Sequence, residues 1–236
     1  MAISIDTVYQ KVLALANKEQ RGYITPQEFN LLANQAQLLI FEQYFYDIEQ
    51  ATLAPGNDTE YSDRINILNE KIAPFQQTSS PLSYNAFYGQ FALPTHHRIG
   101  TVTYNPGSFD YPVEVEEIRE NELIYINSSP ISRPTLNRPV YVQKSEEMIE
   151  VFPSTVETGA IYTTYILKPA IAVWGYTVVN NQALYDSTTT TNFELHPSEE
   201  NELIYKILEL AGIVLNKPGL SQTAEKEDQE ITAKKQ

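Results

Sequence analysis

The segment from Asn17 to Glu28 contains the residue types closest to a calcium-binding loop. A twelve-residue EF-hand loop takes oxygen ligands at positions 1, 3 and 5, glycine at position 6 and glutamate at position 12. Gly22 and Glu28 fall at positions 6 and 12, but Arg21 places a cation at position 5, where a ligand oxygen is needed. Residues 25–28 also form a capping box with proline at the first helical position, which explains the glutamate without a metal. We therefore expect no calcium site here.

The three histidines are the other candidate metal ligands. His96 and His97 are adjacent, so on a strand they point to opposite faces and cannot readily share one ion. His196 precedes a proline at the start of a predicted helix, where it serves as a cap. HExxH, P-loop, GxGxxG and GxSxG motifs are missing from the sequence. No spacing singles out a carboxylate pair among the 30 acidic residues. The sequence therefore predicts no catalytic, cofactor-binding or metal-binding residue, no cofactor, and a protein that is not an enzyme.

Composition narrows the class of protein further. The 236 residues are enough for one large or two modest cores, and the absence of cysteine excludes disulfides and thiolate chemistry. The first residues lack the basic and apolar segments of a signal peptide, and no apolar stretch is long enough to span a membrane. Sixteen tyrosines and a single tryptophan, Trp174, are available for strands, cores or subunit interfaces. We expect Trp174 to anchor a core or an interface.

The formal charge of −14 is spread along the chain, with one concentration between Asp110 and Glu122. No basic stripe of the kind that grips nucleic acid is visible. Two interpretations remain open. The acidity keeps the protein soluble, or it forms a wall past which DNA slides without binding. On the second interpretation, residues 110–122 face a lumen or the solvent.

The first 74 residues predict three helices. Asp6 is expected to cap the first helix, whose apolar positions are Val8, Val12, Leu13, Leu15 and Ala16, and Gly22 to end it. The second helix starts at the capping box and runs to about residue 50. A turn at 55–58 leads to a third helix, which ends before Pro74. Its apolar face consists of Tyr61, Ile65, Leu68 and Ile72.

From residue 75 to 195 the pattern predicts a β-rich module. Residues 75–90 read as irregular, and the later runs are rich in Thr, Val, Ile and Tyr and are interrupted by proline. The expected strands are 90–93, 98–104, 112–115, 140–143, 148–152 and 160–167, with helical turns at 118–125 and a hairpin over 140–152.

Residues 196–236 predict a strong helix followed by a charged tail. The apolar face of the helix consists of Leu203, Ile204, Ile207, Leu208, Ala211, Val214 and Leu215, and residues 216–219 end it. The expected fold class is α+β. Residues 1–74 and 196–236 form a helical part in which the terminal helices pack together, and an antiparallel β-rich module, residues 75–195, is inserted between them.

Several short stretches, in this order and spacing, carry a family resemblance. They are Val8–Tyr9, Asn17–Pro26, Glu28–Asn30, Ser128–Pro130, Arg133–Thr135, Pro139–Tyr141, Val151–Pro153, Tyr165, Leu167–Pro169, Trp174–Tyr176, Phe193–Glu200 and Ala211–Ile213. Together they resemble head-to-tail connector or tail ring proteins, adaptor-like or tail-tubular-like, of short-tailed bacteriophages, especially crAss-like phages.

This resemblance implies a virion structural protein that forms a homo-oligomeric ring of about twelve subunits. Such a dodecamer would lie in the head-to-tail connector or tail, contact the portal or adjacent tail rings, and surround DNA without binding it specifically. Assembly would take place in the host bacterial cytoplasm, with no membrane partner. We expect residues 1–10 and 217–236 to order against neighbouring rings. The alternatives are another virion component such as a tail-fibre-associated protein, a binding module unrelated to phages, or a virion-carried hydrolase.

Overall fold

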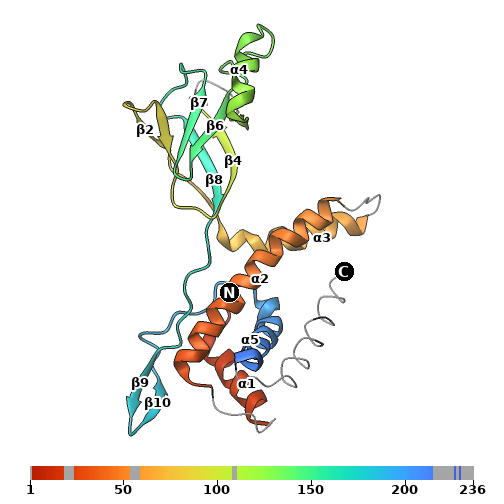
Figure 1. The fold of residues 1–236 in the computed structure, drawn as a ribbon, viewed down its shortest axis with the longest axis vertical. Helices are drawn as coiled ribbons and strands as arrows, with labels where there is room; N and C mark the ends of the chain where they lie inside the picture. The colour runs from red at the N-terminus through yellow and green to blue at the C-terminus, as the bar shows by residue number, and fades with distance from the viewer. Residues whose placement is uncertain are drawn as a thin grey trace. The chain divides into compact units, whose positions relative to one another are not determined.

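The computed structural model describes residues 2–18, 24–53, 59–107 and 111–214, with the single residues 226 and 229 of the tail. These residues form two compact units, residues 1–74 with 169–236, and residues 75–168. Figure 1 shows the helices of the first unit and the sheet of the second. The expected α+β class is confirmed. Several predictions fall outside the described residues. They concern Gly22, the turn at 55–58, the side chains of Tyr61 and Val214, the residue Leu215, the terminator at 216–219 and the tail.

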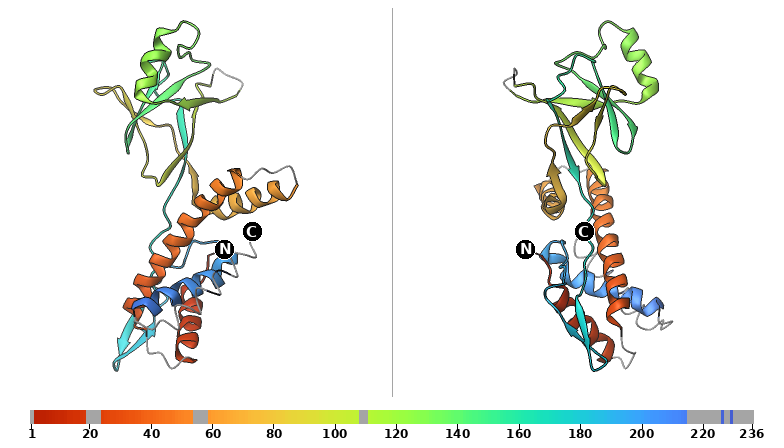
Figure 2. Two further views of the ribbon diagram at one scale, coloured as in Figure 1. Left: turned by 45° about the vertical axis from the view of Figure 1, so that its right-hand side comes forward. Right: turned by 90° about the vertical axis from the view of Figure 1, so that its left-hand side faces the viewer.

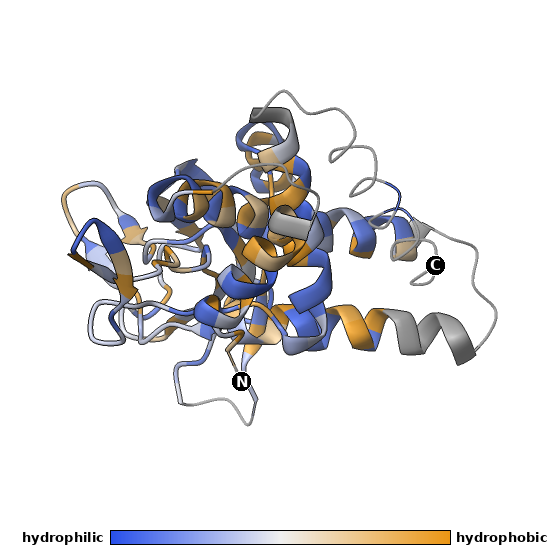
Figure 3. Cartoon of the chain, turned by 90° about the horizontal axis from the view of Figure 1, so that it is seen from below, coloured by the Kyte–Doolittle hydropathy of each residue, from blue (hydrophilic) through white to orange (hydrophobic). Residues whose placement is uncertain are grey.

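The first unit is built on α2 (Pro26–Leu53). Helix α5 (Glu200–Val214) packs against both α2 and α1 (Ile5–Lys18), and α3 (Thr59–Ile72) packs against α2. The terminal helices therefore pack together as expected. Figure 3 shows that both hydrophobic and hydrophilic residues occur along the helices of the chain. The fully buried residues include Val8, Phe29, Ile40, Phe41, Leu203 and Ile207.

The start of α1 differs from the expectation. The helix begins at Ile5, and the Ser4 hydroxyl oxygen accepts a hydrogen bond from the Thr7 backbone N–H at 3.4 Å, so Ser4 rather than Asp6 caps the helix. The Asp6 carboxylate lies in the first turn, where it accepts a hydrogen bond from Gln10. Leu15 is expected on the apolar face but is 37% exposed, whereas Tyr9, which was not assigned to that face, is buried.

The second unit contains an eight-stranded sheet in the order β1-β8-β4-β5-β6-β7-β3-β2. Its strands are β1 (Gln76–Thr78), β2 (Ser83–Asn85), β3 (Gln90–Ala92), β4 (Arg98–Tyr104), β5 (Val113–Glu117), β6 (Val140–Ser145), β7 (Met148–Phe152) and β8 (Ile161–Ile166). All six expected strands are present. Residues 75–90, expected to be irregular, contribute η1 (Ala73–Phe75), β1 and β2.

The sheet is not purely antiparallel, because β5 and β6 pair in parallel. A parallel pair needs a crossover connection, and α4 (Glu120–Ser128) lies in that connection. Figure 2 shows α4 beside the sheet. Leu123 and Ile126 of α4 pack against Ile118, Val140 and Val142, which form a small core apart from the main one. The expected helical turns at 118–125 are thus the start of this crossover.

Residues 169–195 belong to the first unit, whereas the sequence placed them in the β module. They run beside α2 and form a separate two-stranded sheet of β9 (Tyr176–Val179) and β10 (Gln182–Tyr185), which was not expected. The second unit closes earlier, where β1 pairs with β8 and the Leu167 N–H donates to the Phe75 carbonyl at 2.9 Å. The compact β unit therefore ends at Lys168 and not at residue 195.

Candidate functional site

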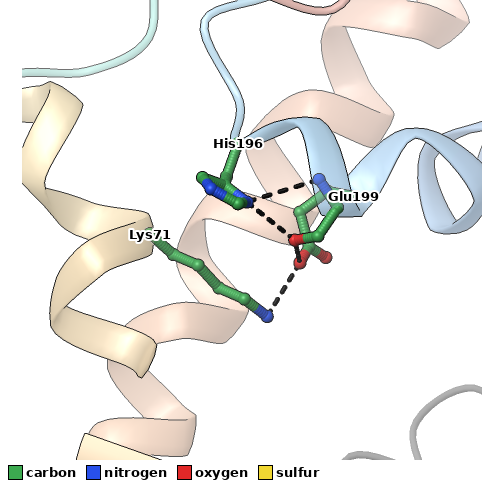
Figure 4. Close-up of polar contacts among 4 residues, drawn as sticks. Lys71, His196 and Glu199 are labelled. Atoms are coloured by element: carbon green, nitrogen blue, oxygen red, sulfur yellow. Dashed lines mark hydrogen bonds and ion pairs between the residues drawn. The ribbon is translucent and has the colours of Figure 1, made fainter. Parts of the chain in front are cut away.

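The most enclosed charged group in the described chain is an ion pair between α3 and the start of α5. Lys71 Nζ lies 2.7 Å from Glu199 Oε1, and the two side chains are 10% and 0% exposed. Glu199 ends the short helix η2 (Pro197–Glu199), and its carboxylate also accepts a hydrogen bond from the Ser198 hydroxyl at 2.9 Å. Figure 4 shows Lys71 reaching Glu199 beside His196. Each partner compensates the other, because a buried charge is costly alone.

Further polar side chains from α2 and α5 surround this pair. Lys71 Nζ lies 5.8 Å from the centroid of the Tyr44 ring, a cation–π distance. Burial, together with the negative charges of Glu199, Glu202 and Asp47, raises the pKa of the Tyr44 hydroxyl well above its usual range. Tyr44 therefore stays neutral. It interacts with Lys71 through the face of its aromatic ring and not as a negatively charged phenolate.

His196 and Ser198 lie at this cluster but do not form a nucleophile and base. His196 Nδ1 accepts a hydrogen bond from the Ser198 backbone N–H at 3.3 Å, so the histidine caps η2, as expected. Although His196 Nδ1 lies 2.9 Å from the Ser198 Oγ, that hydroxyl donates its proton to Glu199. A serine that is activated for attack would donate to the histidine instead. The arrangement is suited to tying α3 to α5.

Sequence reasoning missed Lys71, because its partner is far away in the chain. The two glutamates after Pro197 were assigned to the positive end of the following helix, which is a local explanation. The available signal was a lysine on an otherwise apolar face, one residue before Ile72. Lys71 and Ile72 are both buried.

The capping box at the start of α2 is confirmed. The Glu28 carboxylate accepts hydrogen bonds from the Thr25 N–H at 3.0 Å and the Thr25 hydroxyl at 2.8 Å, and the Thr25 oxygen accepts from the Glu28 N–H. The Thr25 backbone bond, followed by the Thr25 side-chain bond, lowers the pKa of Glu28. The carboxylate that a calcium loop would use is thus engaged in capping. Residues 19–23 of that loop lie outside the described part of the chain.

His96 and His97 lie between β3 and β4 rather than on a strand. His96 Nδ1 lies 2.8 Å from the Pro94 carbonyl, and the His97 backbone N–H donates to Ile166 at 2.7 Å. Both residues belong to the sheet unit, whereas His196 belongs to the helical unit. Within the described ranges, no group of three or more His, Asp or Glu side chains is arranged to hold a metal ion.

Trp174 is a buried anchor in the helical unit. It is 5% exposed, its ring lies 4.4 Å from that of Tyr9 and 5.8 Å from those of Tyr176 and Tyr185, and its Nε1 donates to Asp6 at 2.9 Å. The expected core-or-interface role is therefore a core role, and it joins α1 to the base of the β9–β10 hairpin.

The acidic stretch lies along β5 and beside an open hollow in the sheet unit. Glu114, Glu116 and Glu117 are exposed, and the hollow of about 540 Å³ is also lined by Arg138 and Tyr141. Arg138 lies 3.5 Å from Glu116, and Tyr141 donates to Glu117 at 3.3 Å. Burial, and then the Glu117 carboxylate, raises the pKa of the Tyr141 hydroxyl above its usual range. Asp110 lies outside the described residues.

Large apolar side chains are exposed on several separate elements. Those that are at least 65% exposed are Leu31 on α2, Phe87 in the turn between β2 and β3, Tyr111 before β5, Ile124 and Tyr125 on α4, Ile131 after α4, Ile171 before β9, and Val178 on β9. In the β2–β3 turn, Asn85 Oδ1 accepts hydrogen bonds from the backbone N–H groups of Phe87 and Tyr88, and the two rings contact each other edge to face. Single exposed apolar side chains are ordinary on a protein surface, and they indicate an interaction surface only where several lie side by side.

Comparison with known proteins found no protein-family model and no curated protein that matches this sequence. Across the described ranges, none of the helices combines the length and apolar character needed to cross a membrane.

Proposed function

We propose that this chain is a virion structural subunit that forms a ring in the head-to-tail connector or tail of a short-tailed bacteriophage. The ring contains about twelve copies, encloses the DNA path and contacts the portal or neighbouring rings. The resemblance in the sequence supplies the phage context. The structure supports an assembling subunit over an enzyme or a monomeric binding protein.

The observation that carries the proposal is the exposure of large apolar side chains on elements of both units. A subunit inside a closed ring has two lateral neighbours, and in a stack it also has neighbours above and below. Leu31 and Val178 lie on the helical unit, and Phe87 and Ile131 lie on the sheet unit. A protein with one ligand would need only one such surface, whereas a ring subunit needs several.

The charge of the sheet unit suits passing DNA. Glu114 and Glu116 lie on one exposed face of β5, Glu117 is exposed at the end of the strand, and Arg138 is paired with Glu116. Phosphates are repelled from such a surface, so a duplex would pass without specific binding. We assign this acidic strand to the lumen of the ring.

The test is the mass and symmetry of the assembly, by mass photometry of the purified protein and by cryo-electron microscopy of virions. We expect closed rings of about twelve copies, coaxial with the portal, with β5 facing the channel. A chain that is missing from virions would overturn the proposal. A chain found only in tail fibres would instead favour the tail-fibre-associated alternative.

A virion-carried hydrolase is tested separately by a zymogram on host cell-wall material. We expect no clearing, because the Ser198 hydroxyl and the Glu199 carboxylate are engaged with each other and with Lys71. Clearing by the wild type would contradict the proposal. If the clearing persisted in a Ser198→Ala variant, the enzyme would use other residues.

A further inference from the structure

The β9–β10 hairpin is a well-built element that projects from the helical unit (Figure 1). Val179 pairs with Gln182 across a two-residue turn, in which Asn180 and Asn181 have φ values of 50° and 60°. Positive φ at both central residues is what a type I′ turn requires, and asparagine tolerates it well. The hairpin is therefore specified locally and is not a loop that happens to be extended.

The base of the hairpin is held firmly against α2. The Asn30 side-chain amide accepts a hydrogen bond from the Trp174 backbone N–H at 2.8 Å and donates one to the Trp174 carbonyl at 3.3 Å. The Asn34 amide accepts from the Ala172 N–H at 2.9 Å and donates to the Ala172 carbonyl at 2.8 Å. Gln37 donates to the Ala170 carbonyl at 2.9 Å. At Gly175 a Cβ would lie 2.8 Å from the Asp186 carbonyl oxygen, so the two strands of the base approach closely. The hairpin consequently keeps one direction relative to α2.

Beyond this base, both faces of the hairpin carry exposed apolar side chains. Cross-strand register places Val178 on the face of Tyr176 and Tyr185, and Val179 on the face of Leu184. Their exposures are 65% for Val178, 44% for Tyr185, 48% for Val179 and 50% for Leu184. Two-stranded hairpins are marginal in water unless another surface covers them. The described part of this chain supplies no such cover.

The same unit also presents an apolar surface that faces away from its own core. Leu31 and Leu38 are seven residues apart on α2, as are Leu39 and Tyr46, so all four lie on one side of the helix. They are 74%, 42%, 41% and 61% exposed, whereas Phe29, Ala33, Ala36 and Ile40 face the core. We call these four residues the outer face of α2.

Charge indicates which partner these two surfaces fit. Every copy of this chain carries a net charge of −14, so a contact between two copies is favoured where like charges do not face each other. Residues 174–185, which include the hairpin, contain no charged residue. The outer face of α2 carries one, the exposed Glu42 among Leu38, Leu39 and Tyr46, which would meet no like charge on the hairpin. A basic partner would instead be drawn to acidic surfaces such as β5.

We propose that the β9–β10 hairpin of one copy docks on the outer face of α2 in the next copy. The inference rests on the proposed ring and names its lateral contact. One rigid unit carries both surfaces, and they differ from each other, so the contact is head-to-tail and propagates from copy to copy. Contacts of this kind close into a ring when the rotation per subunit allows it.

Two variants that each remove one half of the contact test this geometry. The hairpin variant carries Val178→Glu and Leu184→Glu, and the α2 variant carries Leu31→Glu and Leu38→Glu. All four side chains are at least 42% exposed, so the fold should survive, which circular dichroism checks. By mass photometry, the wild type should form oligomers. Each variant alone should associate about tenfold or more weakly, because a buried unpaired charge opposes docking.

The decisive sample is an equimolar mixture of the two variants. The mixture retains one intact contact, between the hairpin of the α2 variant and the outer face of the hairpin variant. It should therefore form heterodimers and nothing larger. A matched control with two added glutamates at exposed positions of the sheet unit, Gln143→Glu and Thr155→Glu, should assemble like the wild type.

Three outcomes would overturn the inference: a wild type that stays monomeric, variants that assemble like the wild type, or a mixture without heterodimers. Variants that assemble normally would leave the ring proposal standing with a different lateral contact. Conversely, head-to-tail complementation in a protein that forms open chains or is missing from virions would support the contact and contradict the ring.

Discussion

At the scale of single residues, the ion pair of Lys71 and Glu199 stabilises the helical unit through mutual compensation. The Glu199 side chain is fully buried, and its carboxylate receives the lysine and the Ser198 hydroxyl. Removing one partner of a buried pair leaves the other charge without compensation, whereas replacing both partners by neutral groups removes the problem. Stability should therefore depend on the pair as a unit.

We expect Lys71→Met to lower the free energy of unfolding by about 3–5 kcal/mol, because the Glu199 charge is left buried. Adding Glu199→Gln to the same chain should recover much of that loss. Urea titration followed by circular dichroism measures both changes. Lys11→Met is the matched control. It removes a lysine from the more exposed pair with Glu200 and should cost no more than about 1 kcal/mol. Equal losses from the two lysine variants would contradict this account.

The capping carboxylate of Glu28 predicts a pH dependence. Because its pKa is lowered in the folded state, its contribution to stability is present above the unfolded pKa and is lost as pH falls through the folded pKa. Glu28→Gln should therefore destabilise the protein at neutral pH, and the difference from wild type should shrink below the ordinary carboxyl range. Unfolding midpoints measured from neutral to acidic pH test this. A difference that grows toward acid would contradict the sign.

At the scale of elements, α2 organises the helical unit through polar as well as apolar contacts. Asn30, Asn34 and Gln37 recur at spacings of four and three, so they lie on one side of the helix. Their side-chain amides form hydrogen bonds with backbone groups of Trp174, Ala172 and Ala170. These backbone groups therefore have partners although no described strand pairs with them. Residues 169–175 are thereby joined to the helical unit.

We expect Asn34→Ala to lower the free energy of unfolding by about 1–3 kcal/mol, because both polar groups of the Ala172 peptide lose their partner. Hydrogen exchange should speed up at the Ala172 amide. Gln35→Ala, at an exposed position on the same helix, should change stability by less than about 0.5 kcal/mol. Unchanged hydrogen exchange at Ala172 in the Asn34 variant would show that the Asn34 side chain does not hold residues 169–175 on α2.

At the scale of the whole molecule, the chain is a helical unit interrupted by a complete sheet unit. Strands β1 and β8 begin and end the insertion as antiparallel neighbours, with Gln76 opposite Ile166. The two ends of the inserted segment are therefore adjacent in space, as in domains that tolerate insertion into another fold. Its main core, which includes Phe91, Tyr104, Ile149 and Ile161, lies entirely within residues 75–168.

We expect residues 75–168 to fold when they are expressed alone, with dispersed amide NMR shifts and a cooperative thermal transition. Extending that fragment to residue 195 should add only signals typical of disordered chain, because residues 169–195 have their partners on α2. An unfolded spectrum for residues 75–168, or a large gain in stability from the extension, would contradict this division.

The sequence alone determined the elements whose signals are local. The capping box of Thr25 and Glu28, the cap at His196 and the six strands from Gln90 to Ile166 follow from side-chain chemistry within a few residues, and with them follows the α+β class. The β9–β10 hairpin was missed although its Asn180-Asn181 turn is a local signal.

Only the tertiary structure decided three other features. They are the pairing of Lys71 with Glu199, the parallel pairing of β5 with β6, and the attachment of residues 169–195 to α2. Each joins residues far apart in the chain, and their energies depend on burial and proximity, which no local pattern encodes.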